Sequence, residues 1–365
     1  MGSTIEVCLI SYPYYPSQGT GRGHDRYAFE LSRNIARANG HIHVHSLDQG
    51  YSSGVAAAGT KQLRLLADLL RARADLYHAI SPVGGAMAAM LGKRPLVVTV
   101  HDLVPFHVTK YDASWKHWYV RLCTRIATRK SDAVVVPYEV TKHELVQRFS
   151  VPEAKISVVR YGVDHSRYRP QAGVERKANR VLYIGEVSRS KGVDSLVRAF
   201  ALVAERLPDA ELLIGGKTSK DQPMLERLAH DLDIRNVAFL GYVPEGELSS
   251  YYCSAAAMVF PSRYGFGLST LEAMACGTPV VVGAVLDAPE FLTDAGLLVD
   301  PDDVGQMADA IQRILTENGL RQHLSEKAIE RAKSFSWEGT ARDTASVYVN
   351  VMEKRDRRRS QVSGI

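Results

Sequence analysis

The chain has 365 residues, 45% of them hydrophobic and 23% charged, which excludes a small disulfide-stapled scaffold or long intrinsic disorder and predicts two domains. The net charge of +5 is too mild to name a partner, but it is unevenly divided. Residues 1–170 contain 22 basic and 13 acidic side chains (net +9), and residues 171–365 contain 23 and 27 (net −4). For the basic half, this asymmetry leaves phosphate, nucleic acid, an anionic membrane or a solvated surface open.

The four cysteines form no CxxC pair and have no spacing typical of a metal site, so a reducing, cytoplasmic compartment is expected. No apolar run approaches the ~20 residues of a membrane span, and the N-terminus has no basic segment ahead of an apolar one. These features predict a chain that is neither secreted nor integral to a membrane.

Short apolar runs alternate with helical patterns along the whole chain, which predicts an α/β fold of two doubly wound domains with parallel sheets. The predicted strands are 7–10, 96–100, 133–137, 156–160, 180–185, 210–215, 237–240, 257–260 and 279–282, and the predicted helices are 24–37, 193–205 and 224–231. The polar segment 169–179 is the predicted linker, and the two domains are expected to face one another across a cleft. Since such sheets bind ligands beyond the carboxyl ends of their strands, functional residues are expected just after strands.

Glycines follow the first predicted strand. Gly19, Gly21 and Gly23 lie between this strand and a helix, where a permissive backbone and the helix N-terminus can hold an anion. The loop lacks the Lys-Ser or Lys-Thr of a Walker motif, and its last spacing does not fit a dinucleotide fingerprint. A simple strand-to-helix turn therefore stays open beside an anion-binding loop.

Histidines accompany two further strands. His101 follows the run 96–100 and could hydrogen-bond a substrate hydroxyl or exchange a proton near neutral pH, with a structural histidine as the alternative. His41, His43 and His45 share one face of another presumed strand. Because no further ligand is evident beside them, a zinc site there is not favoured.

In the second half, glycines and charged residues again follow strands. Arg189 and Lys191 come soon after Gly185 and would suit a diphosphate whose negative charge grows as it leaves, with a surface charge pair as the alternative. The stretch 260–281 has a glycine-rich loop and then a helix that carries Glu272. Loop amides could hold a sugar or phosphate, and Glu272 could accept two ribose hydroxyls instead of being a solvated helical residue.

From Ile5 to Tyr348 the chain resembles the retaining, nucleotide-sugar-dependent glycosyltransferases of the GT-B fold, in their large fourth family (group 1). Many motifs in the right order carry the resemblance: the glycine loop before Tyr27, 74–78, 98–103, 131–137, 161–164, 191–192, 265–281, 288–290, and 335–338 with Ala341. It implies two Rossmann-like domains. They are an acceptor-side domain at 1–170 and a nucleotide-sugar-binding domain at 171–339, followed by a helix at 340–352 that returns to the first domain and a basic tail at 353–365.

The resemblance implies a role for each matching residue. Gly21 and Gly23 would approach the donor's diphosphate and transferred sugar, and His101 would face the sugar near its reacting carbon. Lys191 would neutralise the diphosphate, with Arg189 in support, and Glu272 would bind the ribose. The remaining implied donor contacts are Tyr264, Gly265, Phe266, Gly267 and Leu268 around the sugar, and Gly216, Gly241, Tyr242 and Val243 in the nucleotide pocket.

Two residues depart from the family pattern. Tyr264 stands where the family has the first of two glutamates, with seven residues between it and the second, Glu272, so sugar preference and turnover are both open. Glu186 replaces an arginine after Gly185, and a carboxylate beside a diphosphate would repel it. Either Arg189 turns inward as a substitute or Glu186 turns outward.

The predicted activity is the retaining transfer of a hexose from a nucleoside diphosphate sugar, of GDP-mannose or UDP-hexose type, to a glycan or lipid-linked acceptor. No metal motif is present in the sequence, so no metal or other cofactor is expected, and Lys191, Arg189 and backbone N–H groups would assist departure of the diphosphate. No carboxylate stands out as a covalent nucleophile, in line with the family's front-face route. The alternatives are a weak or inactive sugar-nucleotide-binding subunit and a phosphorylase or epimerase of the same fold. No nucleic-acid partner is expected, since no recognition module is present.

A basic amphipathic pattern at 114–130 leaves peripheral contact with an anionic membrane open. Its apolar face is Trp115, Trp118, Tyr119, Leu122 and Ile126, and its basic stripe is His117, Arg121, Arg125 and Arg129. A core helix would show a similar pattern. The basic run 354–359 would add to lipid attraction or stay solvated, so the cytoplasmic protein could also work at the inner face of the membrane.

Overall fold

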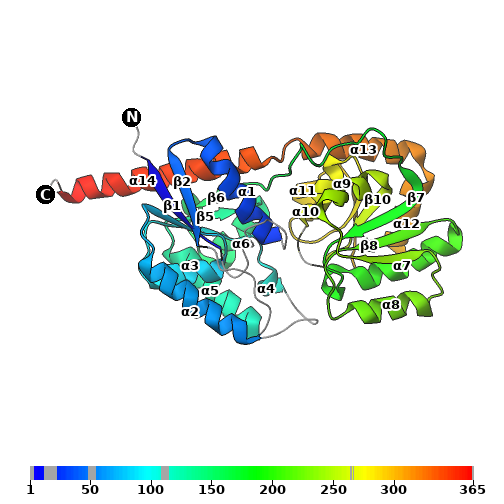
Figure 1. Ribbon diagram of the computed structural model, residues 1–365, viewed down its shortest axis with the longest axis horizontal. Helices are drawn as coiled ribbons and strands as arrows, with labels where there is room; N and C mark the ends of the chain where they lie inside the picture. Colours follow the sequence, from blue (N-terminus) through cyan, green and yellow to red (C-terminus); the bar gives the residue numbers. More distant parts are fainter. Residues whose placement is uncertain are drawn as a thin grey trace. The chain divides into compact units, whose positions relative to one another are not determined.

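The computed structural model describes residues 4–11, 23–47, 55–107, 115–263, 265 and 267–363. The chain divides into two compact units, which we call unit 1 (Met1–Gly162 with Trp337–Ile365) and unit 2 (Val163–Ser336). Each unit contains one sheet of six strands whose neighbours are all parallel, with helices on the sheet (Figure 1). The predicted α/β class with two doubly wound parallel sheets is therefore confirmed.

The sheet of unit 1 has the strand order β2-β1-β3-β4-β5-β6. Its strands are β1 (Ile5–Ile10), β2 (Ile42–Leu47), β3 (Leu76–Ala79), β4 (Leu96–Thr99), β5 (Ala133–Val136) and β6 (Ile156–Val158). Its helices are α1 (Gly23–Ala38), α2 (Val55–Arg71), α3 (Pro82–Met90), α4 (Val104–His107), α5 (Trp115–Lys130), α6 (Glu139–Phe149), the 3₁₀ turn η1 (Glu153–Lys155) and α14 (Trp337–Ser363).

Helices cover both faces of this sheet, which explains why its strands read as continuous apolar runs. Alternate strand residues such as Cys8, Tyr77 and Val98 pack against α2, α3, α5 and α6, and α1 packs with α14 on the opposite face. Gly85 lets α3 approach closely, because a Cβ there would lie 2.8 Å from Val98 Cγ2 and 3.1 Å from Ala127 Cβ.

A buried histidine joins α14 to the sheet. His78 Nδ1 lies 2.6 Å from the hydroxyl of Tyr348 on α14, and its Nε2 lies 2.8 Å from Thr99 Oγ1 on β4. Burial lowers the pKa of His78 from 6.5 to about 3, because the interior disfavours the charged ring. The neutral ring with two hydroxyl partners therefore fixes where the terminal helix lies on unit 1.

Unit 2 is built on the sheet order β12-β11-β10-β7-β8-β9. Its strands are β7 (Lys177–Ile184), β8 (Glu211–Gly215), β9 (Val237–Gly241), β10 (Ala255–Phe260), β11 (Val280–Gly283) and β12 (Leu297–Val299). Its helices are the 3₁₀ turn η2 (Arg189–Lys191), α7 (Val193–Arg206), α8 (Gln222–Asp231), α9 (Glu245–Ser254), α10 (Leu268–Ala275), α11 (Ala288–Leu292), α12 (Val304–Thr316) and α13 (Asn318–Ala332). The chain moves outward from β7 to β9 and then returns to β10, so the strand order reverses between β7 and β10.

The observed divisions differ from the predicted domain boundaries. The chain divides between Gly162 and Val163 and between Ser336 and Trp337, where the predicted boundaries were 170/171 and 339/340. Val163 pairs with Ser336 in a short parallel bridge where the chain enters and leaves unit 2. The helix predicted at 340–352 and residues 353–363 of the predicted tail belong to one helix, α14, which packs on α1.

The predicted linker 169–179 is part of unit 2. Its arginine Arg176 donates to the carbonyl of Gly277 at 2.8 Å and to Ser325 Oγ at 3.3 Å, and β7 begins at Lys177. The polar composition suggested a linker, but Arg176 uses its polar groups in hydrogen bonds to the body of the unit. In the part of the chain that the structure describes, no helix combines the length and apolar character needed to cross a bilayer.

The lowered pKa of His78 predicts a loss of stability in acid. Between about pH 6.5 and 3 the unfolded chain binds a proton that the folded chain does not, so the free energy of unfolding falls as the pH falls. The expected loss at pH 5 is about 2 kcal/mol relative to neutral pH. A His78→Gln variant, measured by urea unfolding at pH 7 and 5, should show a smaller loss than the parent. A His230→Gln control at an exposed position should keep the parent's loss, and equal losses in all three proteins would contradict the assignment.

Candidate functional site

The carboxyl ends of β7 and β10 lie side by side at the point where the strand order of unit 2 reverses, which is where doubly wound sheets bind ligands. The chain leaves β7 into the turn η2, which contains Arg189 and Lys191, and leaves β10 into the loop that precedes α10. Gly216 and 241–243 follow β8 and β9 at the same edge. The described candidates at 189, 191, 216 and 241–243 therefore share one edge of one sheet with the loop that precedes α10.

The ring of Phe260, at the end of β10, is the point where the segment that leaves β7 meets the loop that leaves β10. Lys191 Nζ lies 6.0 Å from the ring centroid. A Cβ on Gly267 would lie 2.6 Å from Phe260 Cζ, and one on Gly185 would lie 3.1 Å from Phe260 Cε2 and 2.7 Å from Tyr183 Oη. Both glycines are thus needed for the loops to approach the ring. Sequence reasoning missed Phe260, because an aromatic residue at a strand end looks like any core residue.

Two other glycines hold backbone segments in contact at this edge. Gly192 has φ +72°, and a Cβ there would lie 1.9 Å from the carbonyl oxygen of Pro261. Gly216 has φ +132°, and a Cβ there would lie 1.8 Å from the carbonyl oxygen of Gly185. Side chains are excluded at both positions by space as well as by backbone conformation.

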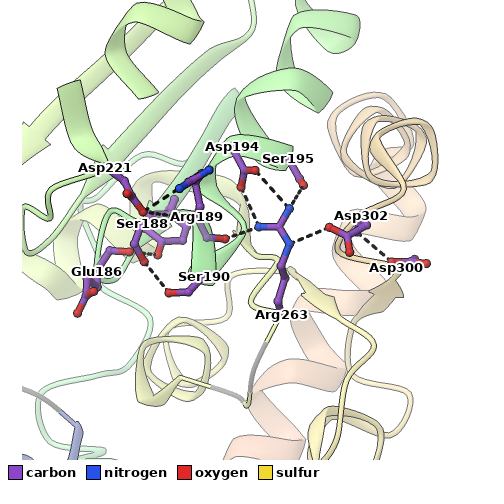
Figure 2. A network of polar contacts seen from close by, with 11 residues as sticks. Glu186, Ser188, Arg189, Ser190, Asp194, Ser195, Asp221, Arg263, Asp300 and Asp302 are labelled. Carbon is purple, nitrogen blue, oxygen red and sulfur yellow. Dashed lines mark hydrogen bonds and ion pairs between the residues drawn. The ribbon is translucent and has the colours of Figure 1, made fainter. Parts of the chain in front are cut away.

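Arg263 ties the two loops together (Figure 2). Its guanidinium donates to both carboxylate oxygens of Asp194 at 2.8 and 3.3 Å, to Ser195 Oγ at 2.9 Å and to Asp302 Oδ1 at 2.7 Å. Nη1 also donates to the carbonyl of Arg189, within η2. The side chain is 11% exposed, and the two carboxylates raise its pKa against the opposing effect of burial. Sequence reasoning did not assign Arg263, because its partners come from three other segments of the chain.

Arg189 and Glu186, the two charged residues discussed beside Gly185, both lie in the described part of unit 2. The backbone N–H of Arg189 donates to Asp221 Oδ2 at 3.0 Å, and its Nε lies 3.9 Å from the same oxygen. Glu186 is exposed, and its carbonyl accepts a hydrogen bond from Tyr183 Oη at 2.7 Å. The Glu186 side chain is thus exposed to solvent, and Arg189 pairs with an acidic neighbour (Figure 2).

Glu272 lies inside unit 2, on the second turn of α10. Only 6% of the residue is exposed, and Tyr252 Oη donates to its Oε2 at 2.9 Å. The alternative of a solvated helical glutamate is therefore wrong. Leu268 begins the same helix, and Gly265 lies in the preceding loop with φ +61°.

The nucleotide-pocket candidates differ in exposure. Gly241 has φ +66° at the end of β9, and its carbonyl accepts the N–H of Gly216 at 2.7 Å. The next residue, Tyr242, is largely exposed, and Val243 is buried. Among the nucleotide-pocket candidates, Tyr242 therefore presents its ring to solvent.

In unit 1, His101 follows β4 and lies among aromatic rings. Its Nδ1 is 2.8 Å from Tyr161 Oη, and the two rings stack with centroids 5.8 Å apart. Tyr27 of α1 contacts the His101 ring edge-on at 4.8 Å, and Gly23 begins the same helix. The structure therefore brings His101 close to the first turns of the helix that follows the glycine loop.

The remaining candidates are three residues outside the described ranges and the run of three histidines. Gly21, Tyr264 and Phe266 lie outside the described residues. His43, in the run of three alternating histidines, pairs with Glu6 at 3.2 Å. Across the described ranges, no three His, Cys, Asp or Glu side chains are grouped to hold a metal ion.

Two family descriptions match consecutive parts of the chain: Glycosyltransferase Family 4 over residues 21–167, and Glycosyl transferases group 1 over residues 164–331. A D-inositol 3-phosphate glycosyltransferase of Corynebacterium aurimucosum is 31% identical over 306 residues, which cover 76% of this chain and 72% of the relative. The chain belongs to the group 1 glycosyltransferases of family 4.

One further relative agrees with this membership, and one solved structure agrees in fold. The O-antigen chain mannosyltransferase B of Escherichia coli is 28% identical to this group 1 glycosyltransferase over 265 residues, 69% of each chain. The solved sucrose-phosphate synthase of Thermosynechococcus elongatus has a TM-score of 0.81 and 23% identity, and the match covers 96% of this chain and 100% of that one. The predicted family and GT-B architecture are confirmed.

The contacts of Arg263 predict a stability effect that exposed ion pairs would not have. An Arg263→Met variant leaves Asp194 and the carbonyl of Arg189 without this donor, and we expect a loss of about 2–3 kcal/mol in the free energy of unfolding. Scanning calorimetry should show the transition of unit 2 lowered by roughly 5–10 °C.

Arg206→Met is the matched control, because Arg206 pairs with Asp309 at 2.7 Å on the exposed surface of the same unit. This change should cost less than about 1 kcal/mol. Equal transition temperatures for the two variants would contradict the role given to Arg263.

Proposed function

We propose that this group 1 glycosyltransferase transfers a hexose from a nucleoside diphosphate sugar, of GDP-mannose or UDP-hexose type, to a hydroxyl of a glycan or lipid-linked acceptor, with retention of anomeric configuration and without a metal ion. The observation that carries the proposal is the meeting of Lys191, Gly185 and Gly267 around Phe260 at the reversal point of the unit 2 sheet. A cation and two close backbone approaches at such a point suit a diphosphate and the sugar attached to it.

Helix ends add to the positive character of this edge. α7 begins at Val193, directly after Gly192, and α10 begins at Leu268, directly after Gly267. Both N-termini follow loops at the carboxyl edge, so their free N–H groups and dipoles favour an anion there. In the proposal, Lys191 and these amides stabilise the negative charge that develops on the departing diphosphate.

Glu272 and His101 have the other proposed roles. Glu272 would accept the hydroxyls of the donor ribose, with Tyr252 Oη holding one of its carboxylate oxygens in place at 2.9 Å. His101 would hydrogen-bond the transferred sugar, with Tyr161 Oη bound to its Nδ1. The acceptor hydroxyl would attack on the face that the diphosphate leaves, and its proton would pass to the departing phosphate oxygen.

A sugar-nucleotide-binding subunit with weak or no turnover is the second candidate. It is favoured by Tyr264, which stands in place of an acidic residue, and by the exposed carboxylate of Glu186 beside the Gly185 turn. Release of nucleoside diphosphate from donor sugars distinguishes this candidate from the transferase. Analysis of the glycosidic product distinguishes the transferase from a phosphorylase or epimerase of the same fold.

A Lys191→Ala variant tests the donor site. Removing the cation should lower kcat/KM for the preferred nucleotide sugar by roughly 10²- to 10³-fold, because charge stabilisation in the transition state is lost. The measurement is nucleoside diphosphate release after a thermal-shift screen of nucleotide sugars has identified the donor. Lys333→Ala, which removes a lysine at the end of α13, should keep the parent's rate. A Lys191→Ala variant with parental rate and donor affinity would remove the proposal.

We also propose that the acceptor is reached at an anionic membrane surface, through α5. The helix packs toward the sheet through Cys123, Thr124 and Ala127, which are all buried. Trp118 is 67% exposed and Leu122 is 40% exposed, whereas Tyr119 and Ile126 of the predicted apolar face pack against the core. Within the basic stripe, Arg121 lies over the ring of Phe106 and Arg125 over that of Phe149. Exposed apolar side chains beside basic ones support a helix that contacts a lipid surface.

Replacing both exposed residues tests this contact. Trp118→Ser with Leu122→Ser should weaken sedimentation with phosphatidylglycerol-containing vesicles by roughly tenfold, because two apolar side chains no longer leave water. The control is Leu232→Ser in unit 2, another exposed leucine, which should leave vesicle binding unchanged. A parent chain without salt-sensitive vesicle binding would rule out the membrane contact.

A further inference from the structure

The last three turns of α14 bring basic side chains together against the amino-terminal edge of the unit 1 sheet. They form a groove of about 690 Å³ with charged lining residues Arg94, Asp132, Lys354, Arg355, Arg358 and Arg359. Pro95 and Val351 add the apolar part of its wall. We call this the basic groove. Five of its side chains are basic and one is acidic, in a volume that matches pockets for small ligands, roughly 300–1,000 Å³.

The charges of α14 are sorted between its faces. Positions 354, 355, 358 and 359 follow the i, i+1, i+4, i+5 pattern of one helix face, and all four line the basic groove. Arg357 lies off this face and pairs with Glu353 at 3.4 Å. The acidic residues of this part of the helix, Glu353 and Asp356, do not line the groove. A merely solvated tail would have no reason to separate its charges in this way.

Two of the groove cations are not neutralised by the protein. Within the ranges that the structure describes, Lys354 and Arg358 have no hydrogen-bond or ion-pair partner. Arg355, in contrast, donates to the carbonyl of Asp75 at 3.1 Å, and Arg94 donates to the carbonyl of Lys130 and lies 3.6 Å from Asp132. Like charges four residues apart on a helix also repel each other, as at 354/358 and 355/359. A bound anion would relieve this repulsion.

The basic groove lies away from the residues assigned to catalysis. Arg94 precedes β4 and His101 follows it, so the two mark opposite ends of one strand, about 20 Å apart along an extended chain. Ligands at the groove would therefore not compete with sugar at the carboxyl edge of the same sheet.

We propose that the basic groove is a second binding site, for a ligand that carries clustered phosphate groups. Planar guanidinium groups such as those of Arg94, Arg355 and Arg358 bind phosphate oxygens in pairs, and the lysine adds a point charge. The concave shape suits a headgroup or a small phosphorylated molecule. An anionic lipid and a soluble phosphorylated compound present the same chemistry, and both are covered by the test.

The soluble arm of the test uses inorganic diphosphate. Isothermal titration at constant ionic strength is done on full-length protein that also carries Lys191→Ala, so that the proposed donor site contributes little. Adding Lys354→Gln with Arg358→Gln should weaken diphosphate binding at least tenfold. The matched control, Arg342→Gln with Arg357→Gln, removes the same charge from the same helix outside the groove and should change binding less than twofold. Thermal melts check that each variant is folded.

The lipid arm uses vesicles of phosphatidylglycerol and phosphatidylcholine, with Lys191 intact. If the groove variant loses vesicle binding and the control does not, the ligand is a lipid headgroup. If only diphosphate binding is lost, the ligand is soluble. Either result supports the basic groove. Equal losses in the groove variant and the control, or no diphosphate or vesicle binding by the parent, would overturn it without affecting the donor site.

Discussion

The candidate donor site depends on one guanidinium group that connects loops from three strands. Arg263 follows β10, but its donors go to η2, to Asp194 at the start of α7 and to Asp302 after β12. The fork of Arg263 meets both oxygens of Asp194, a geometry that fixes direction as well as distance. The turn that carries Lys191 is thereby held against the loop that leads to Gly267.

The hydrogen bonds of Arg263 form only because the backbone segments beside it are in direct contact. The Gly192–Pro261 and Gly216–Gly185 approaches leave no room for a Cβ, so side-chain volume is removed at the same edge where Arg263 adds directed hydrogen bonds. In the proposed function, the donor would meet backbone N–H groups, helix N-termini and Lys191 at this edge. Arg263 holds the loops and is not a donor contact in the proposal, whereas Gly216 holds a loop and is also a candidate donor contact.

The elements and the edge could be predicted from sequence, because apolar runs, glycines and the order of motifs are local signals. The contact residues could not. Phe260 and Arg263 act through partners 65 to 80 residues earlier in the chain, such as Gly185, Tyr183 and Asp194, and no periodicity reveals such contacts. The boundary at 162/163 was missed for a related reason. Arg176 belongs to a polar segment, and its hydrogen bonds to Gly277 and Ser325 are among the contacts that build the segment into unit 2.

Net charge is a poor guide to where a phosphate binds, and the two units show why. The carboxyl edge of unit 2 belongs to the acidic half of the chain, yet its acidic residues are used as partners: Asp194 and Asp302 for Arg263, and Asp221 for Arg189. An arginine between two carboxylates positions the segments that it joins but adds little to the local electrostatic field, because its charge is compensated within a few ångströms. On α14 the reverse holds. Glu353 compensates Arg357, whereas Lys354 and Arg358 project into a groove with a single carboxylate, so the field there is not cancelled locally. What a charged side chain does thus depends on its nearest partners. An arginine holds loops together in unit 2, and in the proposal an arginine with no partner in the described part of the chain binds an anion in unit 1.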